Sequence, residues 1–268
     1  MIISNKQFDF DNNIYVMGIL NVTPDSFSDG NEFFSVDDAK RQALRMVSEG
    51  ADIIDIGGES TRPGYIKISD EEEIERVLPV IEAIKKETDI PLSLDTYKSK
   101  VAKAGIDAGI GLINDIWGLK YDSNMAKVIK EGDVSCCLMH NRDNMDYTDF
   151  YSDYLCDIEK GLARIKEANI DMTKILIDPG VGFAKNTEQN LLVIKKLSEL
   201  GRYNVPVYLG ASRKSVVGNT LGLPVEQRLE GSLAIAVYGA LHGAKVVRVH
   251  DVKETVRAIR MTEAITNI

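Results

Sequence analysis

Short apolar runs recur along the whole chain, and each is followed by a polar loop and then by a segment with the spacing of an amphipathic helix. Within a run, successive residues are apolar rather than alternate ones, which is typical of strands in a parallel sheet that is covered on both faces. The runs are Ile14–Leu20, Ile53–Gly57, Leu92–Leu94, Gly111–Ile116, Val134–Met139, Ile175–Ile177, Val205–Leu209 and Lys245–Val249. We expect each run to form a strand.

The segments between the runs carry helix-start signals, in which a Ser or Asn side chain caps the helix and an acidic or amide side chain three residues later reaches back. These pairs are Ser35 with Asp38, Ser69 with Glu72, and Asn186 with Gln189. Eight strand–helix repeats close most naturally into an α/β fold of the (β/α)8 TIM-barrel type. We therefore expect a single barrel domain over residues 1–268. An open doubly wound sheet is the alternative, but its nucleotide-binding form places G-x-G-x-x-G after the first strand, where this chain has NVTPDSFSDG.

Composition narrows the class of protein further. The net charge of −9, from 32 Lys and Arg against 41 Asp and Glu, argues against binding of duplex nucleic acid and against an electrostatic membrane anchor. No apolar stretch approaches the ~20 residues that span a bilayer, and the N-terminus lacks the pattern of a signal peptide. Cys136, Cys137 and Cys156 lack the spacing of a zinc site. We expect a cytoplasmic enzyme that binds neither nucleic acid nor membranes.

Polar side chains follow every expected strand, and in a barrel the carboxyl ends of the strands share one rim, where the active site lies. The polar residues that helix capping alone does not explain are Asn21, Asp95, Asn114, Asp178, Lys214, Arg248 and His250. Carboxylate and amide groups deep in a barrel mouth cost several kcal/mol unless a partner satisfies them, and a ligand rich in N–H donors would do so. Asp115 and Asp251 are interpreted as caps of the helices that follow them.

The cationic side chains indicate an anionic ligand. Lys214, Arg248 and His250 come from the last two strand ends, where barrels often bind phosphate, and Arg62 lies in the loop after the second strand. The loop over residues 21–35 is long and irregular, as loops that close over a reaction often are. Surface ion pairs and a loop without function are the alternatives to these two interpretations.

Eight short motifs, in order from the first strand to the last, resemble those of the dihydropteroate synthase family. They are NVTPDSFSDG from Asn21, GADIIDIGGESTRPG from Gly50, LDT around Asp95, INDI around Asn114, LMH at 138–140, DPGVGF from Asp178, GASRKS from Gly210 and RVHDV from Arg248. The resemblance implies a barrel enzyme that joins 4-aminobenzoate to (7,8-dihydropterin-6-yl)methyl diphosphate and releases dihydropteroate and diphosphate in folate synthesis. It also implies dependence on Mg²⁺, a homodimer and inhibition by sulfonamides.

The same resemblance assigns roles to individual residues. It implies that Asp95, Asn114, Asp178 and Lys214 bind the pterin, that Asn21 is a magnesium ligand beside the diphosphate, and that Thr61, Arg248 and His250 contact the diphosphate. Ser212 matches a residue near the aminobenzoate carboxylate, Arg62 and Pro63 match one mobile loop, and Asp25, Phe27 and Asp29 match another. Met139, Phe183 and Val249 complete the expected substrate-binding set, and the expected catalytic residues are Phe27, Asp29, Arg62, Asp95 and Lys214.

Two positions depart from the family pattern. Asn31 stands where the family often has glycine, and Asn141–Asn144 replace a Met-Gly-Pro sequence after LMH, so the rim differs while the pterin-binding motifs are intact. The residues suit a dissociative substitution, in which diphosphate leaves first and the Asp95 carboxylate stabilises the pterin cation. A catalytically silent pterin-binding protein and a pterin-dependent corrinoid methyltransferase are the alternatives that stay open.

Overall fold

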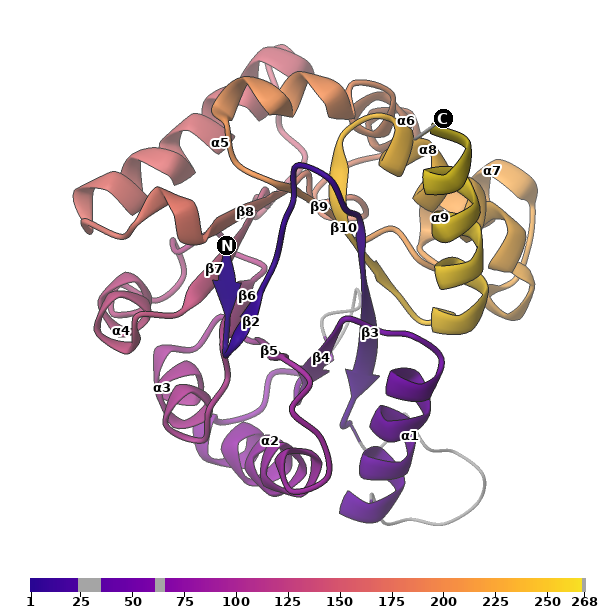
Figure 1. Cartoon of the computed structure of the whole chain (residues 1–268). Coiled ribbons are helices and arrows are strands. Elements are labelled where there is room, and N and C mark those ends of the chain that lie inside the picture. The colour runs from indigo at the N-terminus through magenta and orange to yellow at the C-terminus, as the bar shows by residue number, and fades with distance from the viewer. Residues whose placement is uncertain (24–34, 61–65, 267–268) are drawn as a thin grey trace.

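Each of the eight apolar runs forms a strand, and the strands pair in parallel into a closed barrel in the computed structural model, which describes residues 1–23, 35–60 and 66–266 (Figure 1). The barrel strands are β3 (Tyr15–Asn21), β4 (Ile53–Gly57), β5 (Leu92–Asp95), β6 (Leu112–Asp115), β7 (Ser135–Met139), β8 (Ile175–Asp178), β9 (Val207–Leu209) and β10 (Ala244–Val249). Their order around the barrel follows the sequence, and β10 closes the barrel against β3. The predicted TIM-barrel fold is confirmed.

Helices alternate with the strands and surround the barrel (Figure 1). They are α1 (Val36–Ser48), α2 (Asp70–Lys85), α3 (Ser99–Asp107), α4 (Met125–Gly132), α5 (Phe150–Glu167), α6 (Thr187–Lys195), α7 (Ser215–Leu221), α8 (Leu229–Leu241) and α9 (Val252–Thr266), with short 3₁₀ helices η2 (Met172–Lys174), η3 (Leu197–Tyr203) and η4 (Val225–Gln227). No helix in the described part of the chain is long and apolar enough to cross a membrane.

Of the three expected capping pairs, one forms completely and one in half. At α2, the Ser69 hydroxyl accepts a hydrogen bond from the Glu72 N–H at 3.1 Å, and at α6, Asn186 and Gln189 form a complete capping box. At α1, the Ser35 side chain makes no such bond within the described residues, so that prediction was wrong.

The segment after β9 differs from the single helix that the strand–helix repeat predicts there. It contains α7 and α8, because Gly222 ends α7 in a left-handed conformation (φ 70°) and Pro224 follows.

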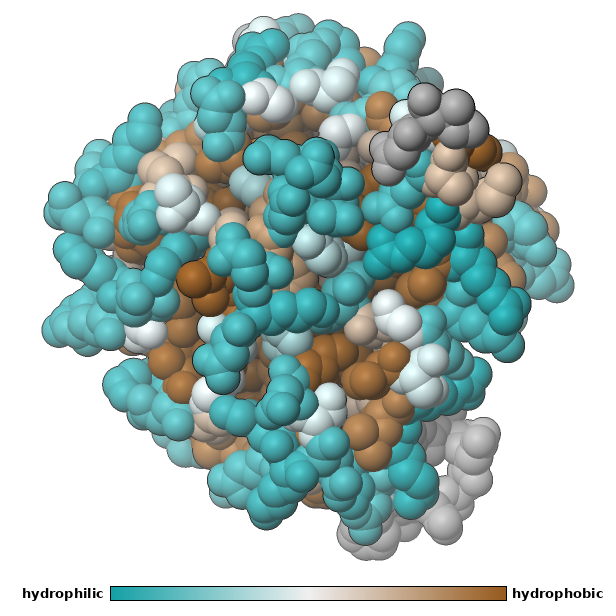
Figure 2. Space-filling view, viewed as in Figure 1, coloured by the Kyte–Doolittle hydropathy of each residue, from teal (hydrophilic) through white to brown (hydrophobic). Residues whose placement is uncertain are grey.

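The sequence did not predict the hairpin of β1 (Ile2–Ile3) and β2 (Lys6–Gln7) that precedes the barrel. Ile3, Phe8 and Phe10 are buried and pack on inward-facing residues from the amino-terminal halves of the barrel strands. In Figure 1 this indigo segment crosses the end of the barrel nearest the viewer, and the same face is largely hydrophilic with apolar patches between its polar side chains (Figure 2). The N-terminal segment therefore closes the bottom of the barrel, opposite the carboxyl ends of the strands.

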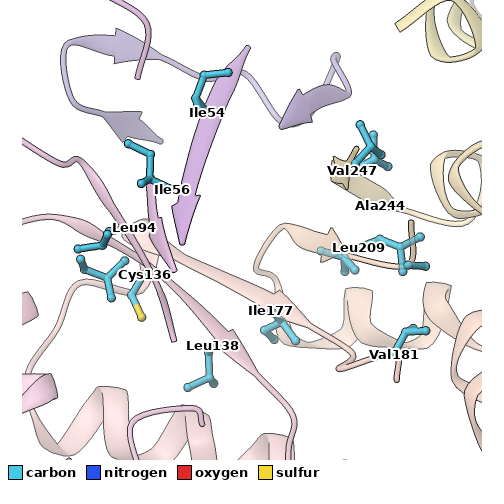
Figure 3. Close-up of a cluster of buried hydrophobic side chains, with 14 of the residues drawn as sticks. Ile54, Ile56, Leu94, Cys136, Leu138, Ile177, Val181, Leu209, Ala244 and Val247 are labelled. Carbon is cyan, nitrogen blue, oxygen red and sulfur yellow. The ribbon is translucent and has the colours of Figure 1, made fainter. Parts of the chain in front are cut away.

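Successive residues of each strand point alternately outward to the helices and inward to the barrel axis. The outward residues, such as Ile54, Leu138 and Val247, form the main hydrophobic core with the surrounding helices (Figure 3). The inward residues nearest the bottom form a second apolar layer, which comprises Met17, Ile53, Leu112, Cys137, Leu176, Tyr208 and Val246. This lower layer is the floor on which the polar residues of the upper barrel rest.

Candidate active site

The inward face of the barrel changes from apolar to polar toward the carboxyl ends of the strands. Two residues beyond the floor layer, the same inward positions hold Asp55 on β4, Asn114 on β6, Asp178 on β8 and Arg248 on β10. Because side chains alternate along a strand, each of these polar groups points into the barrel above an apolar one. The upper half of the barrel is therefore a polar chamber with a hydrophobic floor.

Strand register brings the predicted residues of the first strands to one level of the wall. Asn21 pairs with Gly57, Gly57 pairs with Asp95, and Asp95 pairs with Asn114 in neighbouring strands. A Cβ atom on Gly57 would lie 3.6 Å from Asn21 Oδ1 and 3.7 Å from Asp95 Cβ. The glycine thus leaves the space between these two side chains open.

Arg248 links the acidic residues of the chamber. Its Nε donates to Asp55 Oδ2 at 2.6 Å, and its Nη2 donates to Asp95 Oδ2 at 2.7 Å. The Asn114 amide nitrogen donates to the same Asp55 oxygen at 3.2 Å and to the Tyr208 hydroxyl at 3.3 Å. Asp55 therefore holds both Arg248 and Asn114, and the orientation of the Asn114 amide is fixed by its two acceptors.

Three acceptor oxygens in this network have no hydrogen-bond partner among the described residues. They are Asp55 Oδ1, Asp95 Oδ1 and Asn114 Oδ1, and all three are buried. A buried acceptor without a donor costs about 1–3 kcal/mol. The chamber is thus complementary to a ligand that presents several N–H groups.

The opposite wall is built by the segment that follows β8. The Gly180 N–H donates to Asp178 Oδ1 at 2.7 Å, and Lys214 Nζ donates to the Val181 carbonyl at 2.5 Å. Lys214 Nζ also lies 4.7 Å from the centre of the Phe183 ring, a cation–π contact. Asp178, Phe183 and Lys214, which the sequence placed in the site, are therefore together.

Burial shifts the pKa values of the charged groups in the chamber. It raises the pKa of Asp95 to about 7, against the opposing effect of Arg248. It lowers the pKa of Lys214 to about 8, against the opposing effect of Asp178, and it raises the pKa of Asp178 itself. Each isolated charge is thus poorly solvated, so a ligand that pairs these groups would be bound strongly.

An apolar cluster flanks the polar chamber. Met139 is buried against Tyr97 and Ile116, and the partly buried Phe183 and Trp117 pack on them. Such a surface suits the flat face of an aromatic ligand. Met139 and Phe183 are therefore close to one another, as two members of one predicted site should be.

Other predicted residues lie at the rim or away from the chamber. Ser212 Oγ is 3.2 Å from the His250 backbone nitrogen and 3.1 Å from His250 Nδ1, which brings the ends of β9 and β10 together. The Val249 side chain belongs to the outer hydrophobic core, because Val249 alternates with the inward-facing Arg248. Only the Val249 backbone is therefore available to a ligand. Asp25, Phe27, Asp29, Thr61, Arg62 and Pro63 lie outside the described residues.

The two strand-end acids that were interpreted as caps behave differently. Asp115 accepts from the backbone N–H groups of Trp117 (2.8 Å) and Leu119 (2.9 Å) in the turn after β6, whereas α4 begins only at Met125 with Asn124 at its N-cap, so the prediction of a helix cap was wrong. Asp251 instead forms an ion pair with Arg213, whose Nε lies 3.0 Å from Asp251 Oδ2. Neither acid enters the chamber network.

Asp55 and Tyr208 belong to the chamber but were not predicted from the sequence. Asp55 is fully buried and contacts two predicted site residues, and its signal was a lone charge inside the apolar run IIDIG. Tyr208 carried no comparable signal, since a tyrosine in a buried strand is ordinary core composition. Its hydroxyl, which bonds Asn114 and lies 3.4 Å from Met17 Sδ, joins the polar chamber to the floor.

No group of three His, Cys, Asp or Glu side chains that could hold a metal ion occurs within residues 1–23, 35–60 and 66–266. Asn21 offers one amide oxygen at the top of β3. Mg²⁺ prefers oxygen ligands, keeps several waters, and is often held by one or two protein groups together with substrate phosphates. The Asn21 oxygen is a group of the kind that could bind a Mg²⁺ ion together with a diphosphate.

Comparison with known proteins gives the family. The pterin-binding enzyme family model matches residues 17–250. Dihydropteroate synthases from Clostridium beijerinckii and Bacillus subtilis are 51% and 49% identical to this chain, over 99% and 94% of it and 99% and 88% of their own lengths.

Solved structures agree with these relatives. Dihydropteroate synthase from Clostridium difficile, determined in the presence of pteroic acid, superposes with a TM-score of 0.93 at 47% identity over 97% of this chain and 99% of its own. The Yersinia pestis enzyme in a sulfonamide complex gives 0.92 at 42% identity over 100% and 98% of the two chains. The chain therefore belongs to the pterin-binding enzymes and, among them, to the dihydropteroate synthase family.

Proposed function

We propose that this chain condenses 4-aminobenzoate with (7,8-dihydropterin-6-yl)methyl diphosphate to give 7,8-dihydropteroate and diphosphate. The observation that carries the proposal is the set of buried acceptors without partners in the barrel mouth, Asp55 Oδ1, Asp95 Oδ1 and Asn114 Oδ1. A pterin presents ring N–H and amino donors in one plane, which such acceptors would satisfy. The full-length similarity to dihydropteroate synthases supports the same substrate.

The pterin is held by groups on both sides of the chamber in this proposal. Asp95 and Asn114 accept hydrogen bonds from one edge of the ring, and Asp178 accepts from the other. Lys214, whose ammonium group lies over Phe183, donates to a ring acceptor. The apolar surface around Met139 and Phe183 then contacts the ring system or the aromatic amine.

The diphosphate is expected at the rim. The Arg248 guanidinium and the His250 backbone and side chain supply donors there, and the Ser212 hydroxyl beside His250 is available to the aminobenzoate carboxylate. Asn21 would be a ligand of Mg²⁺, which supplies charge neutralisation of the leaving diphosphate when bound. Thr61, Arg62 and Pro63, together with Asp25, Phe27 and Asp29, keep the substrate, diphosphate and loop roles that the family resemblance implies.

The reaction follows from these positions. The C–O bond to the diphosphate breaks and the positive charge spreads over the pterin ring, where the buried Asp95 carboxylate would stabilise it in a medium of low dielectric constant. The neutral aromatic amine then forms the C–N bond and loses a proton. If water can compete for the cation, hydroxymethyl-dihydropterin accumulates at limiting 4-aminobenzoate, whereas an associative displacement produces none above background.

Several broader features complete the proposal. We infer one functional domain over residues 1–268, a cytoplasmic location, and competition between sulfonamides and 4-aminobenzoate, as the sulfonamide complex of the Yersinia pestis relative suggests. We also infer a homodimer, for which the exposed apolar residues Leu221, Val225 and Leu241 around α8 provide a surface. Sedimentation at micromolar protein concentration tests the dimer.

An assay of product formation and an assay of methyl transfer separate this function from its alternatives. Mixing both substrates with Mg²⁺ should release diphosphate and form dihydropteroate in equal amounts. A silent pterin-binding protein would bind the pterin diphosphate and release nothing. A corrinoid methyltransferase would instead transfer a methyl group from methyltetrahydrofolate to a corrinoid protein.

A further inference from the structure

A buried lysine lies behind the segment that forms the Asp178 wall of the chamber. Lys185, between β8 and α6, is 7% exposed. Its Nζ is 2.8 Å from His140 Nδ1, 2.9 Å from the Gly180 carbonyl oxygen and 3.1 Å from the Phe183 carbonyl oxygen. An ammonium group has three N–H donors, and here each of them has one acceptor.

The histidine partner is set up to accept this bond. An ammonium group only donates, so we assign the acceptor role to His140 Nδ1 and the ring proton to Nε2, which lies 3.4 Å from Asp157 Oδ2. Arg142 Nε donates to the same Asp157 oxygen at 2.5 Å. Burial lowers the pKa of His140 to about 4, which keeps the ring neutral and its Nδ1 an acceptor.

The segment held by Lys185 contacts the chamber on its other side. Gly180 donates its N–H to Asp178 Oδ1, and the Val181 carbonyl accepts from Lys214 Nζ. The chain passes so close to His140 that a Cβ atom on Gly180, whose φ is 70°, would lie 1.9 Å from the His140 carbonyl oxygen. Residues 180–183 are therefore fixed between Lys185 and the groups that face the ligand.

We propose that Lys185 is a positioning residue of the pterin pocket: its ammonium group fixes the segment Gly180–Phe183 and, through it, the Asp178 carboxylate, the Lys214 ammonium group and the Phe183 ring. This inference rests on the function proposed above. It adds a residue that does not touch the ligand, and it predicts a loss of affinity when Lys185 is removed.

A buried lysine satisfies these acceptors at a high desolvation cost. Its three acceptors within the described chain are two carbonyl oxygens and an imidazole nitrogen, and none is a carboxylate. Burial lowers the pKa of Lys185 to about 7, although Asp178 and Asp157 oppose the shift. An apolar side chain of similar volume would avoid this desolvation cost but would leave His140 Nδ1 and the Gly180 and Phe183 carbonyl oxygens without this donor. The charged or titratable groups that surround Lys185 are His140, Arg142, Tyr154, Asp157, Asp178 and Lys214.

The test compares Lys185→Met with Lys195→Met, which removes the same charge from an exposed position at the end of α6. Trp117 is the one tryptophan of the chain and packs on the cluster that contains Met139, so we expect its fluorescence to report binding of a pterin analogue without diphosphate. We expect Lys185→Met to weaken pterin binding and to lower kcat/KM by about 10- to 100-fold, the effect of a misplacement near 1 Å. Lys195→Met should match the wild type in both.

A second pair of variants decides the question if Lys185→Met does not fold. His140→Asn can place its amide oxygen where Nδ1 lies and keep the acceptor, whereas His140→Leu removes it. We expect the Asn variant to retain pterin affinity and the Leu variant to lose it by at least about fivefold, the effect of about 1 kcal/mol. Equal affinity of the two would overturn the inference.

The outcomes also separate this inference from the proposed function. If the wild type forms dihydropteroate and Lys185→Met binds the pterin as tightly as Lys195→Met, only the role of Lys185 is refuted. A lower unfolding temperature of Lys185→Met with unchanged pterin affinity would also refute the role of Lys185, because a purely structural lysine gives this result. If the wild type neither binds the pterin nor forms product, both proposals fail together.

Discussion

The Asp178 carboxylate provides a sharp test of the pterin pocket, because only one of its oxygens is available. Oδ1 accepts from the Gly180 N–H at 2.7 Å, and Oδ2 lies 3.6 Å from the place where a Cβ of Gly210 would be. In Asp178→Asn the amide oxygen should stay at the Gly180 N–H, since an NH₂ group there would face another donor. The NH₂ group then replaces Oδ2 and points its hydrogens toward the proposed pterin donors.

The expected loss follows from this swap. A hydrogen bond to a charged acceptor contributes about 1.5–3 kcal/mol, and the variant also sets a donor against a donor. We therefore expect about 2–4 kcal/mol of lost binding, which corresponds to a Kd raised by about 30- to 900-fold. The change removes the desolvation cost of a buried carboxylate but also the negative charge that favours the ammonium forms of Lys214 and Lys185, so the free energy of unfolding is measured beside the affinity.

Calorimetric titration with a pterin analogue that lacks the diphosphate measures this loss directly. Asp115→Asn is the matched control, because Asp115 is a buried strand-end acid whose two oxygens both accept backbone N–H groups. That variant should lower the free energy of unfolding by about 1–3 kcal/mol and leave affinity unchanged. A Kd for Asp178→Asn within twofold of the wild type, or an equal loss in the control, would refute the assignment.

Three further perturbations have definite expected outcomes. Asn21→Ala should weaken Mg²⁺-dependent binding of the pterin diphosphate and leave a diphosphate-free analogue almost unaffected in calorimetry; equal weakening of both would make Asn21 a structural residue of the pocket. Burial raises the pKa of Asp95 from 3.8 to about 7, so between these values the folded protein retains a proton that the unfolded chain has lost, and stability falls as pH rises through this window. The stability of Asp95→Asn should not fall with pH for this reason. The difference in unfolding temperature between variant and wild type should therefore change from pH 4 to pH 7 and then level off. A difference that is constant with pH would contradict the assignment. Phe8→Ala, in the closure of the barrel bottom, should cost about 3–5 kcal/mol in urea unfolding without altering pterin affinity, and a loss below 1 kcal/mol would show that the hairpin does not contribute to the core.

The strands could be predicted because parallel barrel strands are buried on both sides and stand out as continuous apolar runs. The N-terminal hairpin could not, because each of its strands has two residues, too few for any periodicity. The break between α7 and α8 is marked in the sequence by Gly222 and Pro224, but the eightfold strand–helix repeat predicts one helix after each strand. Residues that end strands were easy to locate along the chain, since loops begin there.

The direction of each side chain was the harder part of the site. Asp55 was not predicted because it lies two residues before the end of β4, whereas the predicted site residues were those at or after strand ends. Alternation from Ile53 through Asp55 to Gly57 places it on the inward face, so counting from the floor layer would have found it. The same alternation predicts that the Val249 side chain points outward, into the core between the barrel and the helices. The bonds among Asp55, Asn114 and Arg248 needed the closed barrel, because they join strands far apart in the sequence.

One measurement addresses the central claim most directly. The purified protein is mixed with (7,8-dihydropterin-6-yl)methyl diphosphate, 4-aminobenzoate and Mg²⁺, and dihydropteroate and diphosphate are quantified over time in the wild type and in Asp178→Asn. The account predicts equimolar formation of both products by the wild type and a rate at least about 30-fold lower in the variant at substrate concentrations below KM. Tight binding of the pterin diphosphate with no dihydropteroate formed, or equal rates for both proteins, would contradict it.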